Sequence, residues 1–315
     1  MNSTKMKAVI CTKYGPPEVL QIKEAEKPTP KDNEVLIKIY ATAVTASDIF
    51  IRSCRVSIQY WIPMRLMIGL TKPRNPIIGL VLAGEIESAG KDIKRFKPGD
   101  QVYGLTGFGL GAYAEYKCMK ETDTAHGCLG LKPANLSYEE ATAAIYGGAL
   151  AFQYLGKGDI QSGQKVLIYG ASGTSGITSV QLAKFLGAEV TAICSTTNLE
   201  LVKSLGADKV IDYTREDSLK QGEKFDFILD AVGKNKTSKL KKACKKALGS
   251  GGKYVSIDDG ALILDSKRLS LIKKLVEAGH IKPVIDRIYP LEQIVEAHAY
   301  VGKGHKKGGV AITVN

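Results

Sequence analysis

The chain has 315 residues, of which 44% are hydrophobic and 24% are charged. This composition is typical of a globular protein, and the length is sufficient for two hydrophobic cores, so we expect two domains. The 44 basic and 32 acidic residues leave a formal net charge of +12, which permits contact with nucleic acid or an acidic surface but does not indicate it.

The compartment follows from what the sequence lacks. No apolar run reaches the ~18 residues of a membrane-spanning helix, and the first residues lack the apolar core of a secretion signal. The six cysteines show no Cys-x-x-Cys spacing, which favours free thiols in a reducing compartment over a zinc knuckle or a redox dithiol. We therefore expect a cytoplasmic protein with no transmembrane segment.

Short strands separated by turns dominate the first part of the chain. They are predicted over residues 6–12, 35–40, 77–88, 101–105 and 111–116. Because no long helix interrupts them, they indicate a barrel-like all-β unit. The apolar segment 58–70 is expected to cover a substrate pocket, and attachment to a membrane surface is the alternative interpretation.

The pattern then changes to alternating helices and strands. Ser137 and Glu140 have the spacing of a capping box, which predicts a helix from there to Leu155. Strands and helices alternate as far as residue 257, as in a parallel α/β sheet. The remaining predicted elements are helices over 267–278 and 292–301 and a final strand over 309–314.

The most informative segment spans residues 165–194. A strand over 165–170 leads into a glycine-rich turn, a helix over 177–186 and a second strand over 189–194. This unit holds the pyrophosphate of a dinucleotide, because glycines let the backbone approach the phosphates and the helix N-terminus attracts them. The alternative is a structural turn in another α/β protein. The candidate pyrophosphate-binding residues are Gly170, Ala171, Ser172, Gly173, Thr174, Ser175 and Gly176.

The end of the second strand indicates which dinucleotide binds. A site for NAD usually has an acidic residue there, but this chain has Ser195, Thr196 and Asn198, with no acid before Glu200. Hydroxyl groups accommodate a 2′-phosphate, so we expect NADP(H), with NAD(H) as the alternative because the turn carries no Arg or Lys. Val232 is a further cofactor-binding candidate.

Tyr213 has two interpretations. It follows a third predicted strand over 209–212, where its ring either flanks the adenosine or is a surface side chain at the end of the strand.

Together these segments resemble the medium-chain dehydrogenase/reductase superfamily, and within it the zinc-independent quinone oxidoreductase-like branch. The stretches that carry the resemblance are 6–9, 34–39, 97–102, 111–116, 132–137, 163–173, 205–208 and 308–310. The resemblance implies an α/β protein that joins a GroES-like β-barrel catalytic domain, 1–130 and 262–315, to a Rossmann domain with a doubly wound parallel sheet, 131–261. It also implies a homodimer.

The resemblance also bears on zinc. Zinc-dependent members carry Cys-His-Thr-Asp where this chain has Thr45-Ala46-Ser47-Asp48, and Gly-His-Glu where it has Gly79-Leu80-Val81. A catalytic zinc needs three protein ligands, so we expect none. A cluster of Cys118, His126 and Cys128 remains, but it lacks a fourth ligand. Without this Lewis acid, the resemblance implies hydride transfer from NADPH to a quinone or an α,β-unsaturated carbonyl.

Four residues are the catalytic candidates by resemblance. The hydroxyl of Thr45 or Ser47 would donate to the substrate oxygen, and Tyr60 would be a proton donor. Asp48 would orient the nicotinamide ribose or the substrate, or else it is a loop carboxylate that holds backbone N–H groups. The four histidines are expected on the surface or on helices, away from the site.

Two departures and two other functions stay open. The run Gly147–Ala151 lacks a threonine that relatives place near the nicotinamide, and Asn198 replaces a lysine of some relatives, so NADPH binding is expected to be weaker. One alternative function is a metal-free NAD(P)-linked alcohol dehydrogenase or carbonyl reductase. The other is a non-catalytic protein that binds nucleic acid or a membrane. We expect no nucleic-acid partner, because no aromatic residues interleave with the lysines of 234–253.

Overall fold

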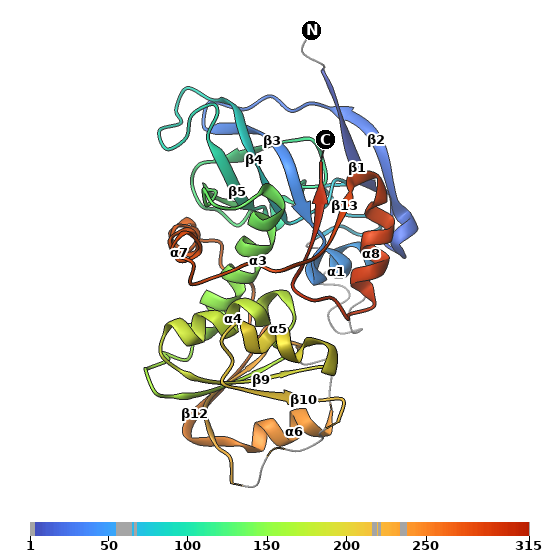
Figure 1. The fold of residues 1–315 in the computed structure, drawn as a ribbon. Coiled ribbons are helices and arrows are strands. Elements are labelled where there is room, and N and C mark those ends of the chain that lie inside the picture. The colour runs from blue at the N-terminus through green and yellow to red at the C-terminus, as the bar shows by residue number, and fades with distance from the viewer. Residues whose placement is uncertain are drawn as a thin grey trace. The chain divides into compact units, whose positions relative to one another are not determined.

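The computed structural model describes residues 4–54, 65, 68–215, 219, 222–233 and 238–314. The chain divides into two compact units. Unit 1 comprises Met1–Ile145, Leu264–Lys273 and Ile285–Asn315, and unit 2 comprises Tyr146–Ile263 and Lys274–Val284 (Figure 1). The division falls inside two helices, α3 (Tyr138–Leu155) and α7 (Ser266–Glu277).

Unit 1 is built on β-strands. A hairpin pairs β1 (Lys5–Cys11) with β2 (Leu20–Glu26). A seven-stranded sheet has the order β13-β14-β3-β4-β5-β7, with β6 on β3. Its strands are β3 (Glu34–Ala43), β4 (Val81–Ala89), β5 (Gln101–Leu105), β6 (Tyr116–Lys120), β7 (Cys128–Leu131), β13 (Ile285–Pro290) and β14 (Gly309–Thr313).

The carboxyl-terminal segment completes unit 1. Strand β14 pairs with β3 in the antiparallel sense, so the two ends of the chain share one sheet. Helices α1 (Ala46–Ser53) and α8 (Ile294–Gly302) contact each other beside this sheet. Apolar side chains from both ends of the sequence, among them Ile37, Leu82 and Ile312, form its core.

Unit 2 contains a five-stranded parallel sheet of order β10-β9-β8-β11-β12. The strands are β8 (Lys165–Tyr169), β9 (Glu189–Cys194), β10 (Lys209–Asp212), β11 (Phe225–Asp230) and β12 (Leu248–Ser256). The order reverses between β8 and β11, and a crevice at such a reversal is where open α/β sheets bind their ligands.

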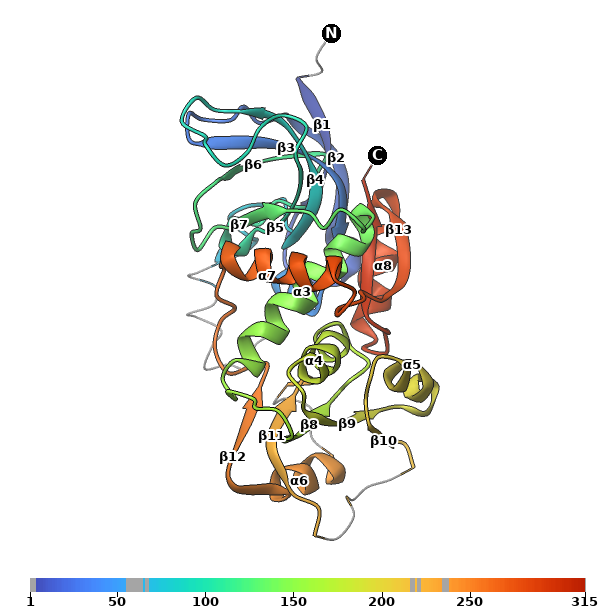
Figure 2. The same ribbon diagram turned by 60° about the vertical axis from the view of Figure 1, so that its left-hand side comes forward.

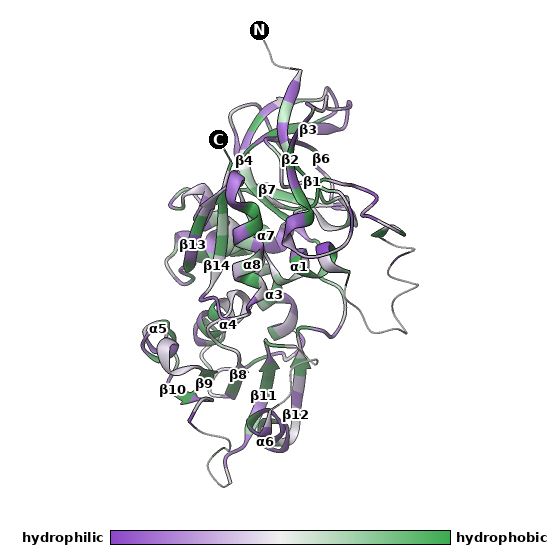
Figure 3. Cartoon of the chain, turned by 90° about the vertical axis from the view of Figure 1, so that its right-hand side faces the viewer, coloured by the Kyte–Doolittle hydropathy of each residue, from purple (hydrophilic) through white to green (hydrophobic). Residues whose placement is uncertain are grey.

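Helices cover both faces of this sheet, which explains its apolar strands. On one face lie α4 (Thr174–Phe185), α5 (Leu199–Ser204) and part of α3, and on the other lies α6 (Lys239–Lys246) (Figure 2). Figure 3 shows the hydrophobic colour along β8 and β11. The predicted α/β class with a doubly wound parallel sheet is therefore confirmed.

Two strand predictions need correction. The strand predicted over 111–116 forms only at its last residue, Tyr116, where β6 begins, and between 111 and 115 only Ala114 makes an isolated bridge, to Ala8. The backbone of Tyr113 divides its hydrogen bonds between two partners, because its N–H donates to Ile78 and its carbonyl accepts from Val9. The strand predicted over 77–88 begins only at Val81. Most of the apolar segment 58–70 lies outside the described residues.

Candidate functional site

The glycine turn after β8 is anchored by backbone hydrogen bonds. The N–H groups of Gly170 and Ala171 both donate to the carbonyl of Ile193, at 3.0 and 2.9 Å. Gly170 has a φ of +86°, a conformation that favours glycine. The N–H of Gly173 then donates to the carbonyl of Gly170 at 3.2 Å, which closes the turn.

The three glycines of the turn have different reasons to be glycine. A Cβ on Gly176 would lie 2.2 Å from the carbonyl oxygen of Gly170, and a Cβ on Gly170 would lie 2.5 Å from Val232. At Gly173 the nearest atom would be 3.6 Å away, and its φ is −77°. Packing therefore requires glycine at the first and third positions, while the space beside Gly173 is open to a ligand.

Gly173 is also the N-cap of α4, and it supplies no side-chain hydrogen bond to the first turn. Helix α4 thus begins one turn earlier than predicted, at Thr174. An uncapped first turn carries partial positive charge and suits a phosphate. An open glycine beside a helix N-terminus is the cradle that a dinucleotide pyrophosphate needs, so the residues present fit the predicted cofactor.

The predicted 2′-phosphate residues are connected to this turn. Asn198 is buried, and its Nδ2 donates to the hydroxyl oxygens of Ser172 at 3.1 Å and Ser195 at 3.0 Å. Its Oδ1 is buried and has no protein partner. The structure therefore brings three of the predicted cofactor residues into one polar group at the ends of β8 and β9.

Asp212 is a neighbour of this group that the sequence analysis missed. It ends β10, and its carboxylate accepts hydrogen bonds from the hydroxyls of Thr196 and Thr214. Burial opposes ionisation, but these hydrogen bonds outweigh it and lower the pKa of Asp212. A carboxylate thus lies at the end of β10, whereas an NAD site usually has one at the end of the preceding strand, here β9. Tyr213, the next residue, is 47% exposed, which leaves both of its interpretations open.

The predicted catalytic turn in unit 1 is a helix cap. Thr45 is the N-cap of α1, and its hydroxyl oxygen accepts from the N–H of Asp48 at 3.2 Å. The carboxylate of Asp48 accepts in return from the backbone N–H of Thr45 at 2.8 Å and from its hydroxyl at 2.6 Å. Asp48 is fully buried, whereas Ser47 is half-buried. Asp48 therefore holds the backbone N–H of Thr45. Tyr60, the other catalytic candidate, lies outside the described residues.

A buried histidine lies close to this cap. His298 on α8 is fully buried, and its Nε2 is 3.1 Å from the hydroxyl oxygen of Tyr113. Burial, with the nearby charge of Arg52, lowers the pKa of His298 to about 3. Burial raises the pKa of Asp48 to about 7 despite the hydrogen bonds from Thr45.

His298 lies on a helix, as expected, but it is fully buried and close to the predicted catalytic turn, which was not expected. Its position is recognisable afterwards, because Ile294, Ala297 and Val301 at helical spacing mark the same buried face.

The described ranges contain no group of three or more His, Cys, Asp or Glu side chains placed to hold a metal ion. Of the predicted cluster, Cys128 is buried and His126 is exposed. Burial raises the pKa of Cys118 to about 11 and that of Cys128 to about 12, so both thiols are protonated at neutral pH. None of the helices in the described part of the chain is long and apolar enough to cross a membrane.

Comparison with known proteins agrees with this geometry. The model of the alcohol dehydrogenase GroES-like domain matches residues 31–128, and two models of zinc-binding dehydrogenases match 176–275 and 261–312. The 2-methylene-furan-3-one reductase of Solanum lycopersicum is 33% identical over 98% of this chain and 79% of its own length.

Two further similarities extend over most of the chain. The chloroplastic quinone-oxidoreductase QR1 of Triphysaria versicolor is 31% identical over 92% of both chains. The solved structure of the quinone oxidoreductase from Coxiella burnetii has a TM-score of 0.82 and 26% identity, covering 99% of this chain and all of that one.

Proposed function

The chain belongs to the medium-chain dehydrogenase/reductase superfamily, in its quinone oxidoreductase-like branch, and from this premise we propose that it transfers hydride from NADPH to a quinone or an α,β-unsaturated carbonyl. The observation that carries the proposal is the open glycine cradle at the N-terminus of α4, continuous with the hydroxyls of Ser172 and Ser195. An open cradle beside these hydroxyls would suit a dinucleotide that bears an additional phosphate.

Unit 2 would hold the cofactor. The turn Gly170–Gly176 would surround the pyrophosphate, and backbone N–H groups of Thr174 and Ser175 in the first turn of α4 would bind it. The N–H groups of Gly170, Ala171 and Gly173 already donate to carbonyl oxygens of the protein. Ser195, Thr196 and Asn198 would surround the 2′-phosphate, and Tyr213 would flank the adenosine. The nicotinamide supplies the hydride chemistry when bound, and the protein's task is to orient it. NAD(H) stays an alternative, because Ser195, Thr196 and Asn198 are all uncharged.

Unit 1 would act on the substrate. Of the two candidate hydroxyls, that of Ser47 would donate a hydrogen bond to the substrate carbonyl oxygen, where negative charge develops as hydride arrives. The one proton of the Thr45 hydroxyl is already donated to Asp48. Asp48 would hold Thr45 through its two hydrogen bonds, at 2.8 and 2.6 Å, which fixes the start of α1 and the backbone that carries Ser47. Tyr60 stays a candidate proton donor. The proposal includes no zinc, a cytoplasmic location and a homodimer.

The deciding experiment measures oxidation of NADPH by the purified protein with a simple quinone and with a simple enone. The same assay is run with NADH and with a chelator. We expect turnover that prefers NADPH and is unaffected by the chelator. If NADPH binds but neither acceptor is reduced with either cofactor, the reductase is excluded and a binding role takes its place.

A further inference from the structure

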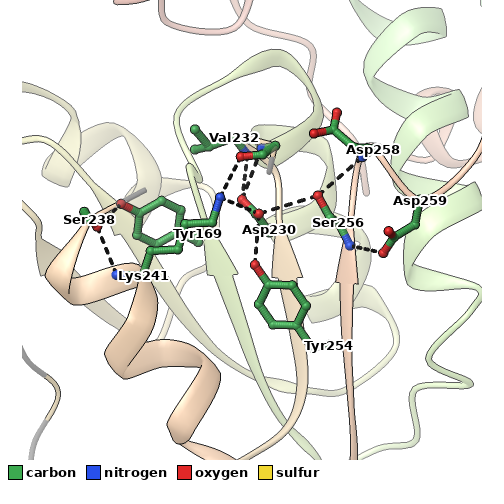
Figure 4. A network of polar contacts seen from close by, with 10 residues as sticks. Tyr169, Asp230, Val232, Ser238, Lys241, Tyr254, Ser256, Asp258 and Asp259 are labelled. Atoms are coloured by element: carbon green, nitrogen blue, oxygen red, sulfur yellow. Dashed lines mark hydrogen bonds and ion pairs between the residues drawn. The ribbon is translucent and has the colours of Figure 1, made fainter. Parts of the chain in front are cut away.

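Asp230, the last residue of β11, is the centre of a buried polar network (Figure 4). Its side chain is fully buried, and its Oδ2 lies 2.7 Å from the Nζ of Lys241, which is only 4% exposed. The hydroxyl of Tyr254 donates to the same oxygen at 2.9 Å. Burial and then the charge of Asp230 raise the pKa of Tyr254, so the phenol stays protonated and remains a donor.

The ion pair clamps the turn that follows β11. The other oxygen of Asp230 accepts the backbone N–H groups of Val232 and Gly233, both at 3.2 Å. Lys241 completes the clamp from the opposite side, since its Nζ donates to the carbonyl oxygen of Gly233 at 2.6 Å. Donors and acceptors of the same two-residue turn are thus held by one carboxylate and one ammonium group.

Lys241 is itself held in place. Ser238, the N-cap of α6, accepts the backbone N–H of Lys241 at 3.0 Å. The same hydroxyl lies 3.0 Å from the hydroxyl of Tyr169, the last residue of β8 (Figure 4). The position of the ammonium group is therefore set by both α6 and β8.

The clamped turn touches the glycine turn that we propose for the pyrophosphate. A Cβ added to Gly170 would lie only 2.5 Å from the Cγ2 of Val232, so the two turns are in direct contact. Gly233 faces the loop after β12, because its Cβ would lie 2.8 Å from the carboxylate of Asp258. Any shift of the Val232–Gly233 turn would change the space around Gly170.

The order of the strands indicates which half of the cofactor this turn meets. The dinucleotide crosses the sheet where the order reverses, between β8 and β11. The Ser195 group at the end of β9 lies on the adenosine side of the glycine turn. The nicotinamide half therefore extends over the opposite side, above the turn that follows β11.

We propose that Lys241 is a positioning residue for the nicotinamide half of the cofactor: through Asp230 and Gly233 it fixes the Val232–Gly233 turn on which that half rests. The inference deepens the proposed function and depends on it. A buried ion pair is a poor source of stability, since a well-packed apolar pair often serves as well. An apolar pair offers nothing to hold the polar groups of the turn, which explains why charges are kept here.

The test replaces Lys241 by Met, an unbranched side chain that is one atom shorter and carries no charge. Dissociation constants are measured by calorimetry for NADPH and for 2′,5′-ADP, a fragment that lacks the nicotinamide half. We expect the dissociation constant of NADPH to rise about 10-fold or more, and that of 2′,5′-ADP to stay within about 2-fold. Equal weakening of both ligands, or no weakening of either, would overturn the proposal.

Lys184→Met is the matched control, because Lys184 lies in the same unit and has the same kinds of partner. Its Nζ is 2.8 Å from the carboxylate of Asp208 and 3.1 Å from the carbonyl oxygen of Ala188. We expect this variant to bind both ligands as the unaltered protein does. If it weakens NADPH alone, as strongly as Lys241→Met does, the special role of Lys241 is refuted.

A second variant covers the case in which Lys241→Met does not fold. Asp230→Asn combined with Lys241→Met leaves no unpaired buried charge, and the amide oxygen still accepts from the turn. We expect the double variant to fold and still to bind NADPH weakly, because the carbonyl oxygen of Gly233 no longer receives a hydrogen bond from Lys241. Normal NADPH binding by the double variant would disprove the inference. Failure of the unaltered protein to bind NADPH would instead disprove the proposed function.

Discussion

The pKa values of two buried side chains in unit 1 are shifted in opposite directions. Burial raises the pKa of Asp48 from 3.8 to about 7 and lowers that of His298 from 6.5 to about 3. The phenol of Tyr113 and the guanidinium of Arg52 are the other ionisable groups of this cluster. Neither shifted group belongs to a simple surface ion pair, so salt will screen these effects poorly.

Their contributions to the free energy of unfolding change with pH in opposite directions. Folded Asp48 keeps its proton more tightly than the unfolded chain does, so the stability it contributes is complete below pH 3.8 and is lost as the pH rises to about 7. Folded His298 binds its proton less tightly, so its contribution is complete above pH 6.5 and is lost as the pH falls to about 3. Across most of this window the two effects oppose each other.

Single substitutions should therefore reveal each group. In Asp48→Asn, urea unfolding should show stability that rises with pH from about 3 to 6.5 more steeply than in the unaltered protein. In His298→Gln, stability should fall more steeply as the pH rises from about 4 to 7. Changes on the order of a few kcal/mol correspond to shifts of this size. Difference curves without slope in these windows would show that the two groups titrate normally in the folded protein.

Asn198 allows a test of cofactor preference. A carboxylate at this position would repel the 2′-phosphate, while the hydroxyls of Ser172 and Ser195 could donate to it and keep the local contacts. We expect Asn198→Asp to raise the KM for NADPH about 10-fold or more and to leave the KM for NADH within about 2-fold.

Ser204→Asp adds the same charge at an exposed position on α5 of the same unit, and it should change neither KM. If Asn198→Asp raises both KM values equally, Asn198 does not contact the 2′-phosphate.

At the level of elements, the glycine turn and α4 give the sharpest contrast. Gly176→Ala places a Cβ 2.2 Å from backbone, whereas Gly173→Ala meets nothing closer than 3.6 Å. We expect Gly176→Ala to cost about 3 kcal/mol of unfolding free energy and Gly173→Ala about 1 kcal/mol or less. Urea titrations of the two variants measure this difference.

Nucleotide binding should separate the same two variants in another way. The new methyl group of Gly173→Ala fills the space proposed for the pyrophosphate, so NADPH affinity should drop in a protein that remains folded. An unchanged NADPH affinity in Gly173→Ala would place the pyrophosphate elsewhere.

Local signals predicted elements well and long-range pairing poorly. The capping box of Ser137 and Glu140 was predicted, and both of its hydrogen bonds are present. Strand β9 has the predicted bounds, and strand and helix lengths in unit 2 follow from buried apolar runs. Residues 111–115 were mistaken for part of a strand because the backbone of Tyr113 bonds to two separate partners, Ile78 and Val9. No local pattern shows that.

The candidate site follows the same division. Ser172, Ser195 and Asn198 were predictable because the strand–turn–helix unit places them by itself. Lys241, Asp212 and His298 were missed because their partners come from other elements: Lys241 meets β11 from α6, and His298 meets Tyr113 across 185 residues of sequence. A lysine in a lysine-rich segment reads as solvated, although this one is buried.

At the scale of the whole molecule, the lysines behind the basic net charge have different roles. Helix α6 contributes Lys239, Lys242, Lys245 and Lys246 as exposed cations, whereas Lys241 of the same helix is an internal structural charge. The same short helix thus carries solvated charges on its outer face and holds the β11 turn from its inner face. A net charge of +12 is accordingly weak support for a nucleic-acid or membrane partner.

The whole-molecule prediction concerns metal. Thr45 and Leu80 stand where zinc-dependent relatives carry ligands, and a hydroxyl and a hydrocarbon do not replace thiolate and imidazole. In the described part of the chain, Cys118, His126 and Cys128 do not form a group that could hold a metal ion. Elemental analysis of the purified protein should therefore find far less than one zinc per chain.

A chelator provides the kinetic form of the same test. Incubation with a chelator should leave NADPH oxidation and thermal stability unchanged, while a zinc-dependent alcohol dehydrogenase treated in parallel loses its activity. The acceptor would then be polarised by hydroxyl groups alone, which restricts the enzyme to substrates that accept hydride readily. One tightly bound zinc per chain, removed together with the activity, would mean that a ligand set outside these positions has replaced the lost one.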